Sequence, residues 1–120
     1  MSIPRLKLTQ GELSLLVYAI DAYLQSLDLP DLFPEHSSKY QHILSDQRLI
    51  FFTLATAYRD FDLVMTEPDI IAVDEAVRGF MRICERLKKG AWGYPQAMSM
   101  LTRIHEKLEQ MKLPPIEQSI

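Results

Sequence analysis

The chain has 120 residues, of which 48% are hydrophobic and 24% charged, and its formal net charge is −3. This length predicts one domain with an ordinary apolar core, spanning residues 1–120. The composition excludes disordered, low-complexity and collagen-like classes. A single cysteine, Cys84, excludes an intrachain disulfide and a C-x-x-C redox or zinc site. The slightly acidic balance gives no general reason to expect nucleic acid as a partner.

The sequence offers no segment that predicts membrane insertion or export. No run approaches the ~20 consecutive apolar residues that a transmembrane helix needs. The apolar stretch 13–20 is bracketed by Glu12 and Asp21, and its spacing is that of an amphipathic helix rather than a signal peptide. We therefore expect a soluble, cytoplasmic protein without a membrane partner.

The clearest local signal is the start of the first helix. Residues 1–8 are expected to form an extended arm. Thr9 and Glu12 then have the spacing of a capping box, in which each side chain accepts a hydrogen bond from the other residue's backbone amide. The helix is expected from near residue 10 to about 27. Its apolar face is formed by residues at helical spacing: Leu13, Leu16, Val17, Ile20, Leu24 and Leu27.

A longer connection should follow, because Pro30 and Pro34 disfavour helix. This connection is unusually apolar and includes Leu32 and Phe33. The second helix is predicted over about 46–65. Its seam consists of residues spaced by three and four: Phe51, Leu54, Tyr58, Phe61 and Met65.

Two further helices complete the predicted fold. The third begins at 67–69, where Pro68 suits the first turn, and ends near Lys89, before Gly90. Its seam runs through Val73, Val77, Phe80, Cys84 and Leu87. The fourth begins near Pro95, its seam consists of Ala97, Leu101, Ile104, Leu108 and Met111, and residues 113–120 form a flexible tail. The fold prediction is an all-α four-helix bundle in up-down-up-down order, with the longer proline-containing connection between the first and second helices.

Few residues point to chemistry. Asp62 is placed at the edge of the apolar face of the second helix, where Tyr58 could be its partner and His105 could line the same pocket. This arrangement is a candidate site for a small molecule or a reaction, although a structural hydrogen bond is the favoured interpretation. No nucleophile or phosphate-binding motif is present. The Glu-x-x-His pattern of di-iron bundles is absent as well, so the sequence predicts no catalytic residue, metal or cofactor.

A basic stripe on the third helix has a simpler interpretation. Arg78, Arg82, Arg86 and Lys89 lie nearly opposite the apolar seam, where a solvated charged face is expected. Asp74 precedes Arg78 by four residues, which favours an ion pair along the helix. Nucleic-acid binding through this stripe is therefore the third hypothesis for function.

The second predicted helix carries a second apolar group, which is the best pointer to function. Leu49, Phe52 and Leu63 lie away from the main seam and would leave an exposed patch on a lone bundle. A cover from the same chain is an equally weighed alternative. The tryptophan in the Gly90–Pro95 turn, Trp92, joins Leu32 and Phe33 as a candidate contact. The leading hypothesis is a non-enzymatic protein-interaction or regulatory module that forms a homodimer. The alternative is a small-molecule-binding or enzymatic bundle.

Overall fold

The structure is a computed structural model, which describes residues 5–27, 40–87 and 93–112. Along these residues the chain forms β1 (Arg5–Leu8), α1 (Gln10–Ser26), α2 (Gln41–Ala55), β2 (Phe61–Val64), α3 (Glu67–Leu87) and α4 (Tyr94–Met111). The predicted helical class and the presence of four helices are therefore confirmed, and a small two-stranded sheet is added. The proline-containing connection and residues 113–120 lie outside the described residues.

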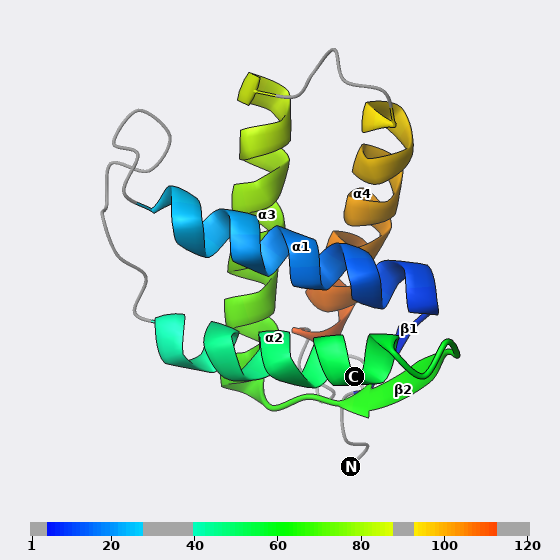
Figure 1. Ribbon diagram of the computed structural model, residues 1–120. Helices are drawn as coiled ribbons and strands as arrows, with labels where there is room; N and C mark the ends of the chain where they lie inside the picture. Colours follow the sequence, from blue (N-terminus) through cyan, green and yellow to red (C-terminus); the bar gives the residue numbers. More distant parts are fainter. Residues whose placement is uncertain (1–4, 28–39, 88–92, 113–120) are drawn as a thin grey trace, which may run out of the picture.

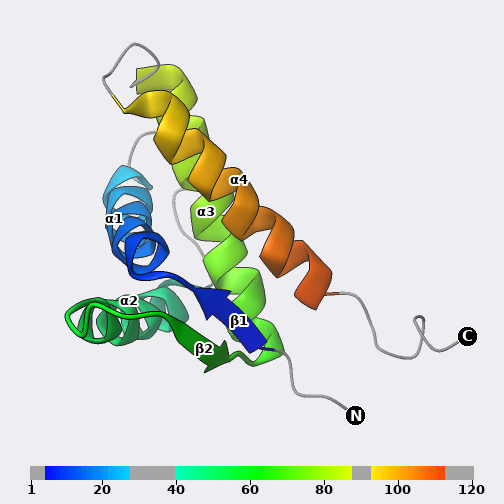
Figure 2. The same cartoon turned by 90° about the vertical axis from the view of Figure 1, so that its right-hand side faces the viewer.

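The helices lie as two crossed pairs. Figure 1 shows α1 and α2 side by side and running in opposite directions, with α3 and α4 forming a second such pair behind them. Turning the molecule shows α3 between the α1–α2 pair and α4 (Figure 2). The up-down-up-down prediction implied four helices alongside one another, whereas here one pair lies across the other.

The starts and apolar faces of three helices follow the sequence pattern. Thr9 caps α1, its hydroxyl accepts a hydrogen bond from the Glu12 amide at 3.1 Å, and Glu12 accepts one from the Thr9 amide at 2.9 Å. The predicted capping box is thus confirmed. The predicted seams of α1, α3 and α4 supply much of the core, in which the following residues are buried: Leu13, Leu16, Ile20, Val73, Val77, Phe80, Cys84, Leu101, Ile104 and Leu108.

The prediction of a second helix reaching residue 65 is wrong, because α2 ends at Ala55. Near its end, the hydroxyls of Thr53 and Thr56 donate back to backbone carbonyls, at 2.9 and 2.7 Å. The last turn tightens into hydrogen bonds between residues three apart, such as Ala57 to Leu54 at 3.1 Å. Tyr58 then takes a left-handed conformation with φ of 54°, which stops the helix.

Residues beyond this turn form β2, which pairs with β1 in antiparallel register. Leu6 faces Leu63 and Leu8 faces Phe61 across the pair. Leu6 and Leu8 are buried, so the residues expected to form an extended arm are instead part of the core. Because strand side chains alternate between faces, Arg5, Lys7, Asp62 and Val64 share the outer face of the sheet. Asp62 and Leu63 therefore belong to a strand and not to the second helix.

The central helix is α3. It packs against α1, α2 and α4, and its buried positions extend around most of its circumference. By contrast, α2 buries Leu44, Gln47 and Phe51. No helix in the described part of the chain has the length and apolar character needed to cross a bilayer.

A glycine allows α1 and α3 to approach closely. A Cβ at Gly79 would lie 2.3 Å from Cδ1 of Tyr23, whose ring is buried. We expect Gly79→Ala to lower the free energy of unfolding by about 1–3 kcal/mol, because overpacking outweighs the gain in helix propensity. Thermal or urea denaturation followed by circular dichroism measures this change.

Gly11 provides the matched control. A Cβ there would meet its nearest neighbour, Met100 Cε, at 3.7 Å, an ordinary contact. Gly11→Ala should therefore raise stability, by up to about 1 kcal/mol. Equal effects of the two substitutions would contradict the close approach of α1 and α3.

Candidate functional site

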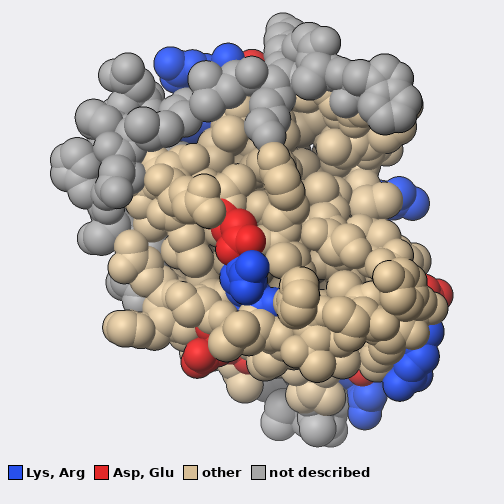
Figure 3. All heavy atoms as spheres, in the orientation of Figure 1, with Lys and Arg blue, Asp and Glu red and all other residues tan. Residues whose placement is uncertain are grey.

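The outward side of α1 and α2 is a surface with several exposed apolar side chains. We call it the α1–α2 face and define it by Ser14, Val17, Asp21, Arg48, Leu49, Phe52 and Tyr58. The exposed fractions of Leu49, Phe52 and Tyr58 are 59%, 52% and 81%. Figure 3 shows a mostly tan surface on this side, with a red and blue group near its middle and further charged groups at the lower left and along the right edge.

One ion pair crosses the α1–α2 face. The Arg48 guanidinium donates a hydrogen bond through Nε to the Asp21 carboxylate, which joins α2 to α1. This hydrogen bond and the negative charge of Asp21 raise the pKa of Arg48 above its ordinary value. The Arg48 guanidinium also lies 5.9 Å from the centre of the Phe52 ring. The charges on this face are therefore balanced within one pair.

A hollow of about 290 Å³ lies beside this pair, between α1 and the end of α2. Its lining consists of Gln10, Ser14, Val17, Phe52, Ala55, Thr56 and Tyr58. The Gln10 side-chain amide donates to Ser14 Oγ at 3.1 Å and to the Ala55 carbonyl at 3.4 Å. With its polar groups paired in this way, the hollow presents mainly apolar and aromatic surface.

The predicted partner-binding residues separate into three groups. Leu49 and Phe52 are exposed on the α1–α2 face, as a partner surface requires. Leu63 is partly buried and packs against the core from β2, because α2 ends before it. Leu32, Phe33 and Trp92 lie outside the described residues.

The predicted pocket residues are not brought together. Asp62 lies on β2 opposite Lys7, with its carboxylate 3.9 Å from the Arg5 guanidinium. Tyr58 lines the hollow on the α1–α2 face. His105 lies on α4 and contacts Asp74 of α3. The prediction grouped these residues on the assumption that helix continued through Asp62.

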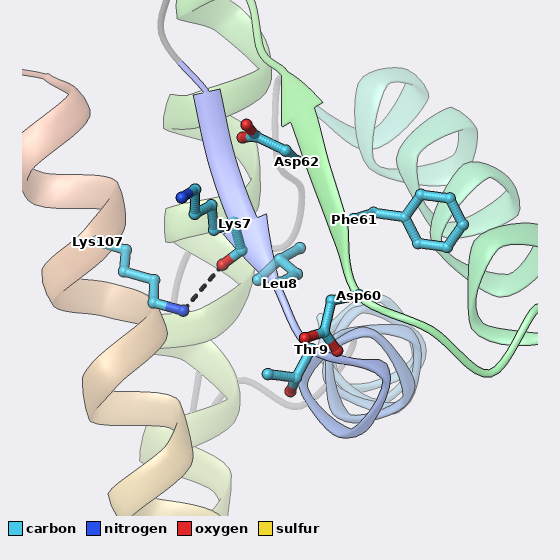
Figure 4. A pocket seen from close by; sticks show the side chains of 7 residues that line it. All are labelled: Lys7, Leu8, Thr9, Asp60, Phe61, Asp62 and Lys107. Atoms are coloured by element: carbon cyan, nitrogen blue, oxygen red, sulfur yellow. Dashed lines mark hydrogen bonds between the residues drawn. The ribbon is translucent and has the colours of Figure 1, made fainter.

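Asp62 does line a hollow, of about 340 Å³, at the edge of the sheet (Figure 4). Its lining consists of Lys7, Leu8, Thr9, Asp60, Phe61, Asp62 and Lys107. Lys107 reaches from α4 and donates to the Lys7 carbonyl at 2.8 Å and to both Glu12 carboxylate oxygens at 3.1 Å. In Figure 4 the Phe61 ring points away from the hollow, whose walls are polar and apolar in about equal measure.

The most buried charge in the described structure is a carboxylate that the sequence analysis did not single out as a site. Asp74 of α3 has no exposed surface. Its Oδ1 lies 2.6 Å from His105 Nδ1, and its Oδ2 accepts from Arg78 Nε at 3.1 Å and Lys112 Nζ at 2.7 Å. Lys112 also donates to Glu109 at 2.8 Å. We call these five residues the Asp74 cluster.

Electrostatics hold the Asp74 cluster in its charged form. Burial acts to raise the pKa of Asp74, but hydrogen bonds from Lys112 and His105 and their positive charge outweigh burial, so this pKa lies below its ordinary value. Partial burial acts to lower the pKa of Lys112, but hydrogen bonds to Asp74 and Glu109 outweigh that effect and raise it. Both groups are therefore ionised near neutral pH.

Two spacings in the sequence pointed toward this cluster. Asp74 and Arg78 are four residues apart, and so are His105 and Glu109. The missing information was that α4 covers the side of α3 that carries Asp74.

No protein-family model, curated protein or solved structure matches this chain.

Proposed function

We propose that this chain is a non-enzymatic interaction module that forms a homodimer through the α1–α2 face. The observation that carries the proposal is the exposure of Leu49, Phe52 and Tyr58 on the side that also carries the Asp21–Arg48 ion pair. Exposed apolar patches of this kind mark interaction surfaces in water-exposed proteins. Aromatic side chains are also the residues that most often dominate binding energy.

Charge balance favours a second copy as the partner. In a two-fold interface the same surface lies on both sides, so it must be complementary to itself. The α1–α2 face meets this condition, because Asp21 and Arg48 place one negative and one positive group side by side. Across a two-fold axis, each could also approach its opposite in the other copy. The α1–α2 face carries no excess of positive or negative charge that would attract a strongly acidic or basic partner.

Tyr58 supplies independent support. Its φ of 54° is a conformation that glycine or asparagine adopts more easily. Its side chain is 81% exposed, so it is little buried by the rest of the chain. Strained positions concentrate at functional sites, and a large aromatic group here fits a contact with another molecule.

Small-molecule binding at the Asp62 hollow is the second candidate. The hollow carries charges of both signs, with Lys7 and Lys107 facing Asp60 and Asp62, which would suit a ligand that is itself zwitterionic. It ranks lower because every one of these charged side chains keeps contact with solvent. Nucleic-acid binding ranks third, since Arg78 is paired with buried Asp74. A cytoplasmic location is part of the leading proposal.

The experiment is sedimentation equilibrium of the full chain over a range of concentrations. Wild type is expected to show a concentration-dependent dimer. Leu49→Glu and Phe52→Glu should each raise the dimer dissociation constant at least about tenfold, because each places an unpaired charge in the contact. Tyr58→Gly should weaken the dimer while leaving the monomer as stable as before or slightly more stable.

Val64→Glu is the matched control. Val64 is 55% exposed, like Phe52, but lies on the outer face of the sheet. It should leave the dimer dissociation constant unchanged. A wild-type chain that stays monomeric at its highest attainable concentration would overturn the proposal, and so would equal effects of Val64→Glu and Leu49→Glu.

A further inference from the structure

The geometry points to a binding site for a borderline transition-metal ion, Zn²⁺ or Co²⁺, where Asp74 of α3 meets His105 and Glu109 of α4. One ligand atom from each of these three side chains lies within 4.8 Å of the other two. An imidazole nitrogen with carboxylate oxygens is a donor set that suits these metals. Three protein ligands would leave a fourth position for water.

Helix geometry holds the three donors on rigid elements. His105 and Glu109 are four residues apart on α4, so they share one side of that helix. Asp74 projects from the facing side of α3, and its distance to His105 is already 2.6 Å. Two ligand atoms of one tetrahedral ion with bonds of about 2.0–2.2 Å lie roughly 3.4 Å apart, so small rotations that separate these two atoms would admit the ion between them.

The three ligand side chains differ in their exposure to solvent, from a buried carboxylate to an exposed one, which gives a metal ion a way in. Side-chain exposure is 0% for Asp74, 29% for His105 and 50% for Glu109. The buried carboxylate anchors one end, and the exposed carboxylate leaves an opening to solvent at the other. Arg78 donates to Asp74 from outside the donor set and fixes the orientation of its carboxylate, as outer partners do in metal sites.

A cation already occupies the bridging position. Lys112 Nζ lies 2.7 Å from Asp74 Oδ2 and 2.8 Å from Glu109 Oε1, so its ammonium group joins the two carboxylates. Lys112 is the C-cap of α4 and its side chain is 30% exposed, which lets the long side chain move into solvent. A divalent ion would replace this ammonium, and the two carboxylates would balance its charge. The Lys112 ammonium therefore competes with the metal ion for the Asp74 and Glu109 carboxylates.

The test is titration of the full, chelator-treated chain with Co²⁺, followed through the visible absorption bands of the bound ion. One Co²⁺ per chain should bind, and Zn²⁺ should displace it. His105→Phe and Glu109→Gln should each weaken binding at least about tenfold, since loss of even an outer partner costs 10–100-fold. Lys112→Met should bind Co²⁺ several-fold more tightly than wild type.

The tighter Co²⁺ binding expected of Lys112→Met cannot result from poor folding. It therefore tests the site independently of the variants that are expected to bind less metal. The matched control is His42→Ala, because His42 and Asp46 form another His–carboxylate pair four residues apart, exposed on α2. His42→Ala should leave Co²⁺ binding unchanged. The inference is overturned if wild type gives no Co²⁺ bands, if Lys112→Met binds no more tightly, or if His105→Phe binds as well as wild type.

Discussion

Replacement of Leu8 by alanine is expected to lower the free energy of unfolding by about 2–5 kcal/mol. The Leu8 side chain is 1% exposed, and the strand that carries it pairs with β2 and contacts both α1 and α4. Truncation would remove buried apolar surface and leave a cavity that the paired strands cannot readily close. For a domain whose total stability is typically 5–15 kcal/mol, this is a large fraction.

Urea denaturation at equilibrium measures the effect. Val64→Ala is the control on the same sheet, where the side chain is 55% exposed, and it should change stability by less than about 0.5 kcal/mol. Leu8→Ala with an effect as small as the control would mean that residues 5–8 form a peripheral arm, as the sequence pattern suggested.

Asp74→Asn is expected to destabilise the fold by about 2–4 kcal/mol near neutral pH. The substitution keeps the shape of the side chain but removes the negative charge that Arg78, His105 and Lys112 face. The cost falls short of that for a fully buried ion pair, because Arg78 and Lys112 can regain water at their exposed ends.

The destabilisation should depend on pH in a defined direction. The pKa of Asp74 is lowered in the folded chain, so ionised Asp74 stabilises the fold above its unfolded pKa of about 3.9. This stabilisation is lost as the pH falls through the lower, folded pKa. The raised pKa of Lys112 acts in the opposite range, with stabilisation present below about pH 10.4 and lost as the pH rises through the folded value.

Urea denaturation of wild type and Asp74→Asn in the presence of chelator, at neutral pH and at about pH 3, tests this direction. The difference in free energy of unfolding should be largest at neutral pH and should shrink in acid. Arg86→Gln is the control, since Arg86 is an exposed residue of the same helix. A difference that stays constant with pH would show that charge on Asp74 contributes nothing to stability.

The sequence predicted the helices whose signals are local. Thr9 and Glu12 mark the start of α1 because capping depends only on residues three apart. The apolar periodicity of α3 and α4 was equally informative, since the predicted seam residues of both helices that the structure describes are buried or partly buried. In such elements, local preference and the final packing agree.

The prediction that the second helix continues to residue 65 was wrong for a physical reason. Phe61 and Met65 continue the spacing of Phe51 and Leu54, so a short strand looked like two more helical turns. What decides the outcome is β1, more than fifty residues away, which supplies the backbone partners for β2. Pairing with a distant segment leaves little trace in a four-residue run.

The candidate sites divide along the same line. Helix periodicity alone placed Leu49 and Phe52 away from the main seam, with exposure and a cover from the same chain weighed equally, and both side chains are exposed. The Asp74 cluster could not be assembled from sequence, because its members come from two helices whose relative rotation is set by packing. Lys112 in particular lies beyond the last α4 residue and gains its role only where α4 ends beside Asp74.

Lys107 of α4 contacts β1 and α1, and these contacts have a consequence for folding during synthesis. Its ammonium joins the Lys7 carbonyl and the Glu12 carboxylate, across sequence separations of 100 and 95 residues. On the ribosome, the opening strand and the first helix emerge long before this cation does. Until α4 has left the exit tunnel, Glu12 lacks its counter-ion and β1 lacks the helix beside it. Residues 5–112 can therefore complete this part of the fold only after α4 has left the tunnel.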